Sequence, residues 1–340
     1  MSSLIEEVAQ RLGLSYSLKL NPLPTGFAEG QLEGQQVSCA WNERGSRVEA
    51  LFDPPLDLGL HVHSRGFANM PSLAARVVLG DSNWDDEVMA TADDPARAAV
   101  LFASDARRSV LGLNAITSYL ELSDESVVTH AMVLDVEAVI QALTHVARIA
   151  AVIAAERHRV PVARPLLAHA AVLQAFSREH DLMLRETPLD LRGELASAQL
   201  VARFVRTGSN EFDLDLRATP LDAPPGFGLV VRRGSALDRV RTFFGGQDIL
   251  TGDPVFDPAF LARAEDEPRA LGALEGDVRA LLLDLSARFE EVSLDDAALS
   301  ARTPVARVRP EDLTMLLEAA CTVTERVARA AAAVTRGPYR

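Results

Sequence analysis

Residues 251–260 read Thr-Gly-Asp-Pro-Val-Phe-Asp-Pro-Ala-Phe, and residues 79–88, 172 positions earlier, read Leu-Gly-Asp-Ser-Asn-Trp-Asp-Asp-Glu-Val. Both segments contain Gly-Asp, then an aromatic residue three positions after that aspartate, and then a second aspartate. An acid–proline pair follows each segment, Asp94-Pro95 in the first case and Glu267-Pro268 in the second. The same features in the same order indicate that one structural unit occurs twice in this chain.

Further matches extend the repeat in both directions. Gly30 and Gly193 open similar stretches 163 positions apart, whereas the separation is 172 at the Gly-Asp segments and about 175 at the Ala-rich pattern that closes each half. A separation that drifts slowly while the order is kept is typical of a duplication with small loop insertions. A chain of 340 residues also fits about two domains. We therefore predict repeats over residues 1–160 and 161–340, joined by a short proline-containing linker.

Periodicity assigns secondary structure to each repeat. Apolar residues recur at helical spacing over residues 2–12, and they alternate with polar residues on both sides of a turn at 207–210. The acid–proline pairs predict helix starts, and the leucines after Glu267 predict one continuous helix through Leu285. The expected fold class is α+β, with an antiparallel β-sheet and flanking helices in each of two tandem copies.

The segment at 251–260, followed by an acid–proline helix start and a leucine-rich helix, resembles a bacterial domain family of unknown function. In that family the pattern T-G-D-x-x-F-D-x-x-F follows a β-meander. The second repeat keeps the pattern, whereas the first has Leu79, Trp84 and Val88 in place of the threonine and the two phenylalanines. The resemblance covers most of each repeat. It implies the same α+β architecture and no catalytic residue.

Charge and composition exclude several classes of function. The chain has 34 basic and 48 acidic residues, hence a formal charge of −14 at pH 7, which argues against binding to a nucleic-acid backbone. Lys19 is the only lysine, so no lysine completes a phosphate-binding loop or pairs with ATP phosphates as in a protein kinase. We expect no nucleic-acid partner and no cofactor.

Cysteine usage and hydropathy predict a soluble cytoplasmic protein without membrane association. Cys39 and Cys321 offer neither a C-x-x-C pair nor a disulfide framework, so we expect two buried thiols in a reducing compartment. The most apolar stretch, residues 138–155, is interrupted by Gln141, His145 and Arg148 and falls short of a membrane span. The N-terminal residues are acidic where a signal peptide needs a basic start.

The paired aspartates of the repeat are candidate ligands for a hard cation. They are Asp81 and Asp85 in the first copy, and Asp253 and Asp257 in the second. Carboxylates four positions apart in a turn supply the oxygen atoms that such ions prefer, although a calcium loop gathers more of them in one dense run. We favour a structural interpretation, in which the acids accept hydrogen bonds from local backbone N–H groups while the aromatic residues enter the core.

His61 and His63 form a second metal candidate, because alternate residues of a strand project from the same face. The corresponding residues of the second repeat, 230–232, contain no histidine, and no third ligand lies nearby in sequence. We therefore favour a solvent-facing polar edge. The chain has no H-E-x-x-H pattern and no G-x-S-x-G nucleophile elbow, and thus offers no recognisable catalytic constellation.

The sequence favours a non-enzymatic protein-interaction or assembly module. The duplication creates a pseudo-symmetric surface, and the Ala-rich helices expected at 136–157 and 311–335 allow close approach of a protein partner or of a second copy of the chain. The alternative is a metal-dependent hydrolase or small-ligand binder that uses the acid pairs and the two histidines in a cleft between the repeats. The sequence leaves this alternative open.

Overall fold

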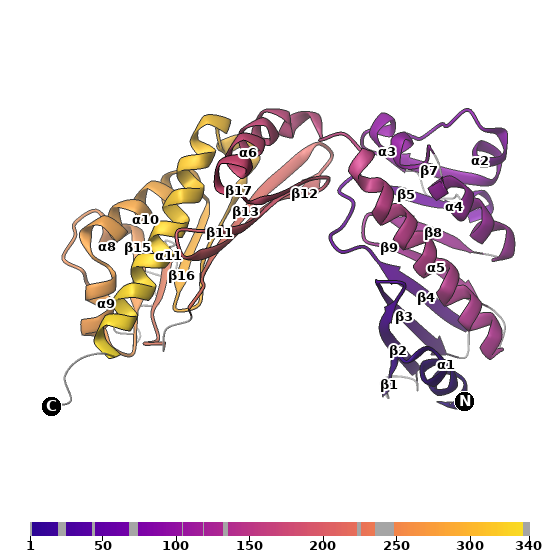
Figure 1. The fold of residues 1–340 in the computed structure, drawn as a ribbon, viewed down its shortest axis with the longest axis horizontal. Helices are drawn as coiled ribbons and strands as arrows, with labels where there is room; N and C mark the ends of the chain where they lie inside the picture. The colour runs from indigo at the N-terminus through magenta and orange to yellow at the C-terminus, as the bar shows by residue number, and fades with distance from the viewer. Residues whose placement is uncertain are drawn as a thin grey trace. The chain divides into compact units, whose positions relative to one another are not determined.

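The computed structural model confirms an α+β fold with two antiparallel sheets (Figure 1). It describes residues 2–19, 25–42, 45–67, 74–103, 105–117, 119–131, 135–222, 226–234 and 248–335. The chain divides into two compact units, Met1–Pro161 (unit 1) and Val162–Arg340 (unit 2), one residue beyond the boundary expected from the sequence. Each unit has its own sheet, its own helices and its own hydrophobic core.

Unit 1 contains a nine-stranded sheet in the order β1-β2-β3-β4-β9-β8-β5-β7-β6. Its helices are α1 (Ser2–Leu12), α2 (Ser82–Glu87), α3 (Pro95–Leu101), α4 (Asp105–Ile116) and α5 (Val136–Glu156). Its strands are β1 (Ser15–Lys19), β2 (Thr25–Leu32), β3 (Gln35–Asn42), β4 (Gly45–Leu51), β5 (His61–Ser64), β6 (Ala75–Arg76), β7 (Val88–Ala92), β8 (Leu120–Ser123) and β9 (Ser126–Ala131).

Unit 2 contains an eight-stranded sheet in the order β10-β11-β12-β13-β17-β16-β14-β15. Its helices are α6 (Leu167–His180), α8 (Phe256–Ala259), α9 (Glu267–Ala273), α10 (Gly276–Arg288) and α11 (Leu313–Thr335). Its strands are β10 (Met183–Glu186), β11 (Leu189–Leu195), β12 (Ala198–Gly208), β13 (Glu211–Pro220), β14 (Val230–Arg233), β15 (Phe260–Arg263), β16 (Glu291–Asp295) and β17 (Leu299–Pro304). Along the described chain, these elements follow one another as in unit 1, apart from the short edge strand β6.

The matched glycines Gly30 and Gly193 allow close packing at the start of each sheet. A Cβ atom at Gly30 would lie 2.8 Å from Leu14 Cδ2, and a Cβ atom at Gly193 would lie 2.6 Å from Leu182 Cδ2. Both leucines are buried and belong to the cores of their units. A larger residue would require the leucine side chain to move, so glycine at both positions allows the same close contact in each half.

Two details of the predicted helices differ from the structure. The cap of α9 is Asp266, whose carboxylate accepts from Arg269 N–H at 3.2 Å, and Glu267 is the first helical residue. The prediction of one continuous helix through Leu285 is wrong, because α9 ends at Ala273 and α10 begins at Gly276. The break at Leu274 turns that side chain fully into the core, and the two short helices can then pack in different directions.

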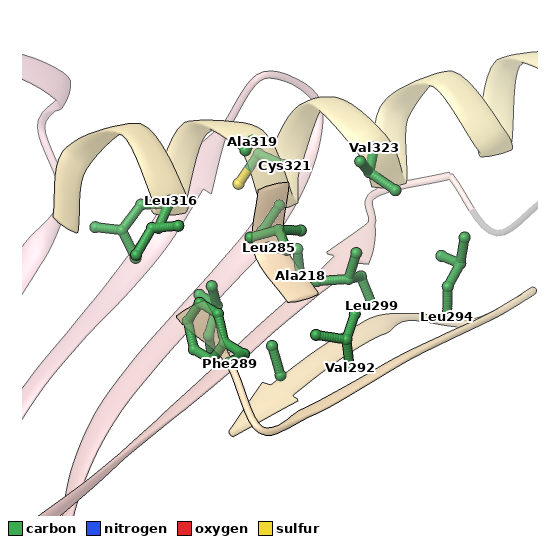
Figure 2. Close-up of a cluster of buried hydrophobic side chains, with 14 of the residues drawn as sticks. Ala218, Leu285, Phe289, Val292, Leu294, Leu299, Leu316, Ala319, Cys321 and Val323 are labelled. Atoms are coloured by element: carbon green, nitrogen blue, oxygen red, sulfur yellow. The ribbon is translucent and has the colours of Figure 1, made fainter. Parts of the chain in front are cut away.

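Each sheet is covered by helices on one face, which places the cores between helices and strands. Figure 1 shows α4 and α5 along the sheet of unit 1, and α10 and α11 along the sheet of unit 2. In Figure 2, α11 directs Leu316 and Val323 toward the buried strand residues Val292 and Leu299. Along β12 buried and more exposed residues alternate, as expected for a sheet that packs on one face only.

One helical stretch, Val136–Arg159, is long and apolar enough to cross a membrane by length and composition. On that criterion the prediction that residues 138–155 fall short of a membrane span was wrong. In the structure, α5 packs against β3, β4 and β9, and its buried residues belong to the core of unit 1. The core helix of a soluble protein meets the same criterion, and this packing fits a soluble protein.

Candidate functional site

The second aspartate of each Gly-Asp segment closes a tight turn. Asp257 accepts hydrogen bonds from the Thr251 backbone N–H at 3.0 Å, from the Thr251 hydroxyl at 2.7 Å and from Gly252 N–H at 3.0 Å. In unit 1, Asp85 accepts from the N–H groups of Leu79 at 3.2 Å and Gly80 at 3.0 Å. Both carboxylates therefore satisfy backbone donors that the turn would otherwise leave without a partner.

The first aspartate of each segment accepts hydrogen bonds from backbone N–H groups at the start of a short helix. Asp253 accepts from the N–H groups of Val255 and Phe256, and these bonds together with Arg279 lower its pKa. Asp253 also forms an ion pair with Arg279 at 3.2 Å. In unit 1, Asp81 is the N-cap of α2, accepts from the N–H groups of Asn83 and Trp84, and pairs with Arg107 at 2.9 Å. The structural interpretation of the aspartates thus agrees with their contacts.

The two histidines lie on a central strand rather than at an edge. His61 and His63 belong to β5, which pairs with β7 on one side and β8 on the other. The described residues contain no group of three or more His, Cys, Asp or Glu side chains arranged to hold a metal ion. The structure therefore does not bring the acid pairs together with the histidines within either unit.

Thermal unfolding offers a test of the acidic turns. We expect Asp257→Ala to lower the free energy of unfolding of unit 2 by about 2–3 kcal/mol, because it leaves two backbone N–H groups and a hydroxyl without their acceptor. We expect Mg²⁺, Ca²⁺ and Mn²⁺ to leave the Tm of the wild-type chain unchanged. A cation-dependent rise in Tm that Asp257→Ala abolishes would show that the turn binds metal after all.

Sequence reasoning missed a pair of aspartates with a comparable structural role. Asp124, in the β8–β9 turn, accepts from the N–H groups of Leu58 at 3.0 Å, Gly59 at 2.7 Å and Leu60 at 3.1 Å. Asp296 accepts from three successive N–H groups before β14 in the same way. Asp124 and Asp296 are 172 positions apart, the separation of the Gly-Asp segments, and this shared spacing was the signal that could have identified them.

The face of the unit 1 sheet opposite its helices carries an aromatic and histidine cluster. The Tyr119 hydroxyl donates to Glu121 Oε2 at 2.6 Å, and the Tyr119 ring meets the His130 ring edge-on at 4.6 Å between centroids. His130 lies opposite Arg47 on β4, and His63 lies opposite Glu121 on β8. Four neighbouring segments thus present titratable side chains on one face.

The protonation of this cluster is shifted by its surroundings. Burial, together with Glu121, raises the pKa of Tyr119 to about 12. Burial lowers the pKa of His130, and Arg47 lowers it further. Burial and the neighbouring His61 also lower the pKa of His63. The histidines are therefore held toward their neutral forms, and Tyr119 is unsuited to act as a base near neutral pH.

The corresponding face of unit 2 is charged and hollowed. A furrow of about 360 Å³ runs over β12, β13, β16 and β17, and its lining includes Arg203, Asp215, Arg217, Glu291 and Arg302. Arg302 pairs with Asp213 at 2.9 Å and with Asp215 at 3.4 Å. Burial raises the pKa of Asp215 despite its arginine neighbours. This face combines exposed cations with carboxylates in a shallow concave surface.

Comparisons with known proteins add little to this description. No protein-family model matches the chain, and no curated protein sequence does. The crystal structure of the mycobacterial trehalose monomycolate transport factor A, TtfA, is similar over 47% of this chain and 96% of that chain, at 9% sequence identity and a TM-score of 0.35. At this TM-score the similarity supports no conclusion about function.

Proposed function

We propose that the chain is a non-enzymatic protein-interaction or assembly module that binds protein through the uncovered faces of its two sheets. The observation that carries this proposal is the furrow of unit 2, where exposed arginines and carboxylates from four neighbouring strands line one concave surface. Arginine is enriched in protein interfaces, and its planar guanidinium suits paired hydrogen bonds to carboxylates. The aromatic and histidine cluster gives unit 1 an equivalent face of different chemistry.

The same proposal includes three further statements about the chain. It contains an internal duplication, it belongs to the T-G-D-x-x-F-D-x-x-F family, and it is located in the cytoplasm. The duplication is supported by the shared order of elements and by matched contacts, such as Asp81–Arg107 and Asp253–Arg279. Two copies of one fold present two related faces to a partner. Among the residues that the structure describes, the paired aspartates are engaged by backbone donors, which does not favour the alternative of a metal-dependent hydrolase or small-ligand binder.

Site-directed photo-crosslinking in native lysate tests the proposal. A photoreactive phenylalanine analogue replaces Gln36 on the open face of unit 1 or Arg217 on that of unit 2, and the matched control replaces the exposed Met315 on α11. We expect protein adducts of defined mass at the open-face positions and not at position 315. Absence of adducts at both open faces would refute the proposal.

A further inference from the structure

One row of side chains crosses the open face of unit 2 with regularly alternating charge. The row consists of residues that are direct cross-strand partners. In order across the sheet they are Glu291, Arg302, Asp215, Arg203, Asp190 and Arg185. The row, here called the charge ladder, thus takes one residue from each of six neighbouring strands, β16, β17, β13, β12, β11 and β10. Its charges read −, +, −, +, −, + from one side of the sheet to the other.

The ladder is not a requirement of the fold, because unit 1 builds the equivalent row from other residues. In its strand register, His130, Arg47, Ala40, Phe27 and Ser17 lie opposite one another across β9, β4, β3, β2 and β1. Tyr119 extends this row through its ring contact with His130. Alternating charge therefore appears in one of two closely similar sheets, which points to a role beyond sheet stability.

Contacts within unit 2 neutralise the charges of the ladder only in part. The side chains of Arg203, Asp215 and Arg302 stay 44%, 39% and 48% exposed. Asp215 Oδ1 and Arg185 Nη1 are buried yet have no hydrogen-bond partner in the described structure. Asp190 differs, because its side chain is 2% exposed and is engaged by Arg192 and Arg203. The side chains of Asp215 and Arg203 are therefore partly exposed on the open side, although Asp215 Oδ1 itself is buried and lies 3.4 Å from Arg302 Nε.

The ladder is complementary to the ladder of a second copy that runs in the opposite direction, because each positive residue then faces a negative one. A two-fold axis parallel to the strands, between β12 and β13, would place each residue opposite the one at the mirrored position of a second copy. Asp215 then faces Arg203, and Glu291 faces Arg185, with each pair formed twice. A two-fold axis that runs along the ladder would instead place each residue opposite the same residue of the other copy, so that like charges would meet. Because sheets are twisted, the central pair comes closest and contributes most.

The dimensions of the face suit such an interface. Six strands at about 4.8 Å spacing span about 24 Å, and strands of up to about 11 residues at about 3.3 Å span about 36 Å. That rectangle is an upper bound, because only β12 is so long; the 43 residues of the six strands cover about 680 Å², close to the roughly 800 Å² that each partner buries in a standard stable interface. Only the β12–β13 part of each furrow would face its counterpart, whereas the part over β16 and β17 would face β10 and β11 of the other copy and leave room for bridging water.

We infer that the chain forms a two-fold symmetric dimer in which the open faces of two copies of unit 2 pack together through their charge ladders. This inference deepens the proposed interaction function and rests on it, and it names a second copy of this chain as the partner. The central contacts are Asp215 of each copy with Arg203 of the other.

Charge reversal with complementation tests the pairing on the purified full-length chain. Arg203→Asp and Asp215→Arg each place like charges at both central contacts, so each variant alone is expected to dimerise at least about a hundredfold more weakly than wild type. In an equimolar mixture every central contact again joins opposite charges. Analytical ultracentrifugation at one physiological ionic strength, with native mass spectrometry of mass-tagged chains, is expected to show mixed dimers.

Two controls keep the outcome interpretable. Arg178→Asp makes the same charge change on α6, away from the open face, and is expected to dimerise like wild type. Arg203→Gln and Asp215→Asn remove charge without adding repulsion, and they are expected to weaken the dimer by about tenfold even if a reversed variant folds poorly.

Three results would overturn the inference: a wild-type chain that stays monomeric up to millimolar concentration, reversed variants that dimerise as wild type does, or folded variants that fail to complement each other. A monomeric chain that still gives open-face crosslinks to another protein would refute only the self-pairing. The absence of all crosslinks at the open faces would refute the proposed function itself.

Discussion

Asp124→Ala is expected to lower the free energy of unfolding of unit 1 by about 3–5 kcal/mol, since it leaves three successive backbone N–H groups without an acceptor. Asp124 is only 6% exposed, so water cannot readily replace its carboxylate. It also joins the β8–β9 turn to the segment that leads into β5, which lies beside β8 in the sheet. Its loss should therefore loosen two neighbouring strands together.

Tryptophan fluorescence measures this effect in unit 1 alone, because both tryptophans, Trp41 and Trp84, lie in that unit and are buried. The variant is expected to unfold at a clearly lower denaturant concentration than wild type. Labelling of the buried Cys39 thiol should accelerate by a hundredfold or more, as unit 1 opens more often. Labelling of Cys321 in unit 2 should not change.

Two matched variants identify the hydrogen bonds as the cause. Asp124→Asn keeps the oxygen that accepts from the N–H groups of Leu58 and Leu60, which share Oδ1. Its NH₂ group replaces the oxygen that accepts from the Gly59 N–H, so two donors then face each other. We therefore expect the free energy of unfolding to fall by about 1–2 kcal/mol. Asp296→Ala removes the equivalent contacts from unit 2 and should leave tryptophan unfolding unchanged. Equal stability of Asp124→Ala and wild type would show that the turn carboxylate does not hold the strands together.

The sequence predicted those features that local chemistry dictates. Helix 2–12, the hairpin turn at 207–210 and the hydrogen bonds of Asp253 to local backbone N–H groups follow from periodicity and from the preferences of turn residues, and the structure confirms them. The break between α9 and α10 could not be predicted in this way. The leucines on both sides keep a helical pattern, whereas in the structure α9 ends at Ala273 and Leu274 is buried in the core.

The charge ladder of unit 2 could be predicted from the sequence even less than the break between α9 and α10. Alternation within β12 and β13 was visible in the sequence, and it placed Arg203 and Asp215 away from the core. Nothing in the sequence states which residue of β11 or β17 lies opposite them. Because the ladder takes one residue from each of six strands, it exists only once the register is fixed, and register is a property of the folded sheet.

The buried cysteines are expected to make both units less stable at alkaline pH. Burial raises the pKa of Cys39 and of Cys321 from 9.0 to about 12, and Glu318 adds to the shift at Cys321. An unfolded chain releases these protons above about pH 9, whereas the folded chain retains them. Each contribution is complete below pH 9 and is lost as the pH rises toward 12, by up to about 4 kcal/mol per thiol.

Cys39→Ala isolates the thiol effect in unit 1. Tyr119, whose pKa rises from 10.0 to about 12, also destabilises unit 1 in alkali, but only above about pH 10. Between about pH 9 and 10 the thiol is therefore the dominant source, and the stability of wild type, measured by tryptophan fluorescence, should fall with a slope that Cys39→Ala removes. Cys321→Ala, which alters the other unit, should keep the slope. An unchanged slope in Cys39→Ala would mean that Cys39 does not carry the alkaline sensitivity of unit 1, and that its proton is not held by burial in the core.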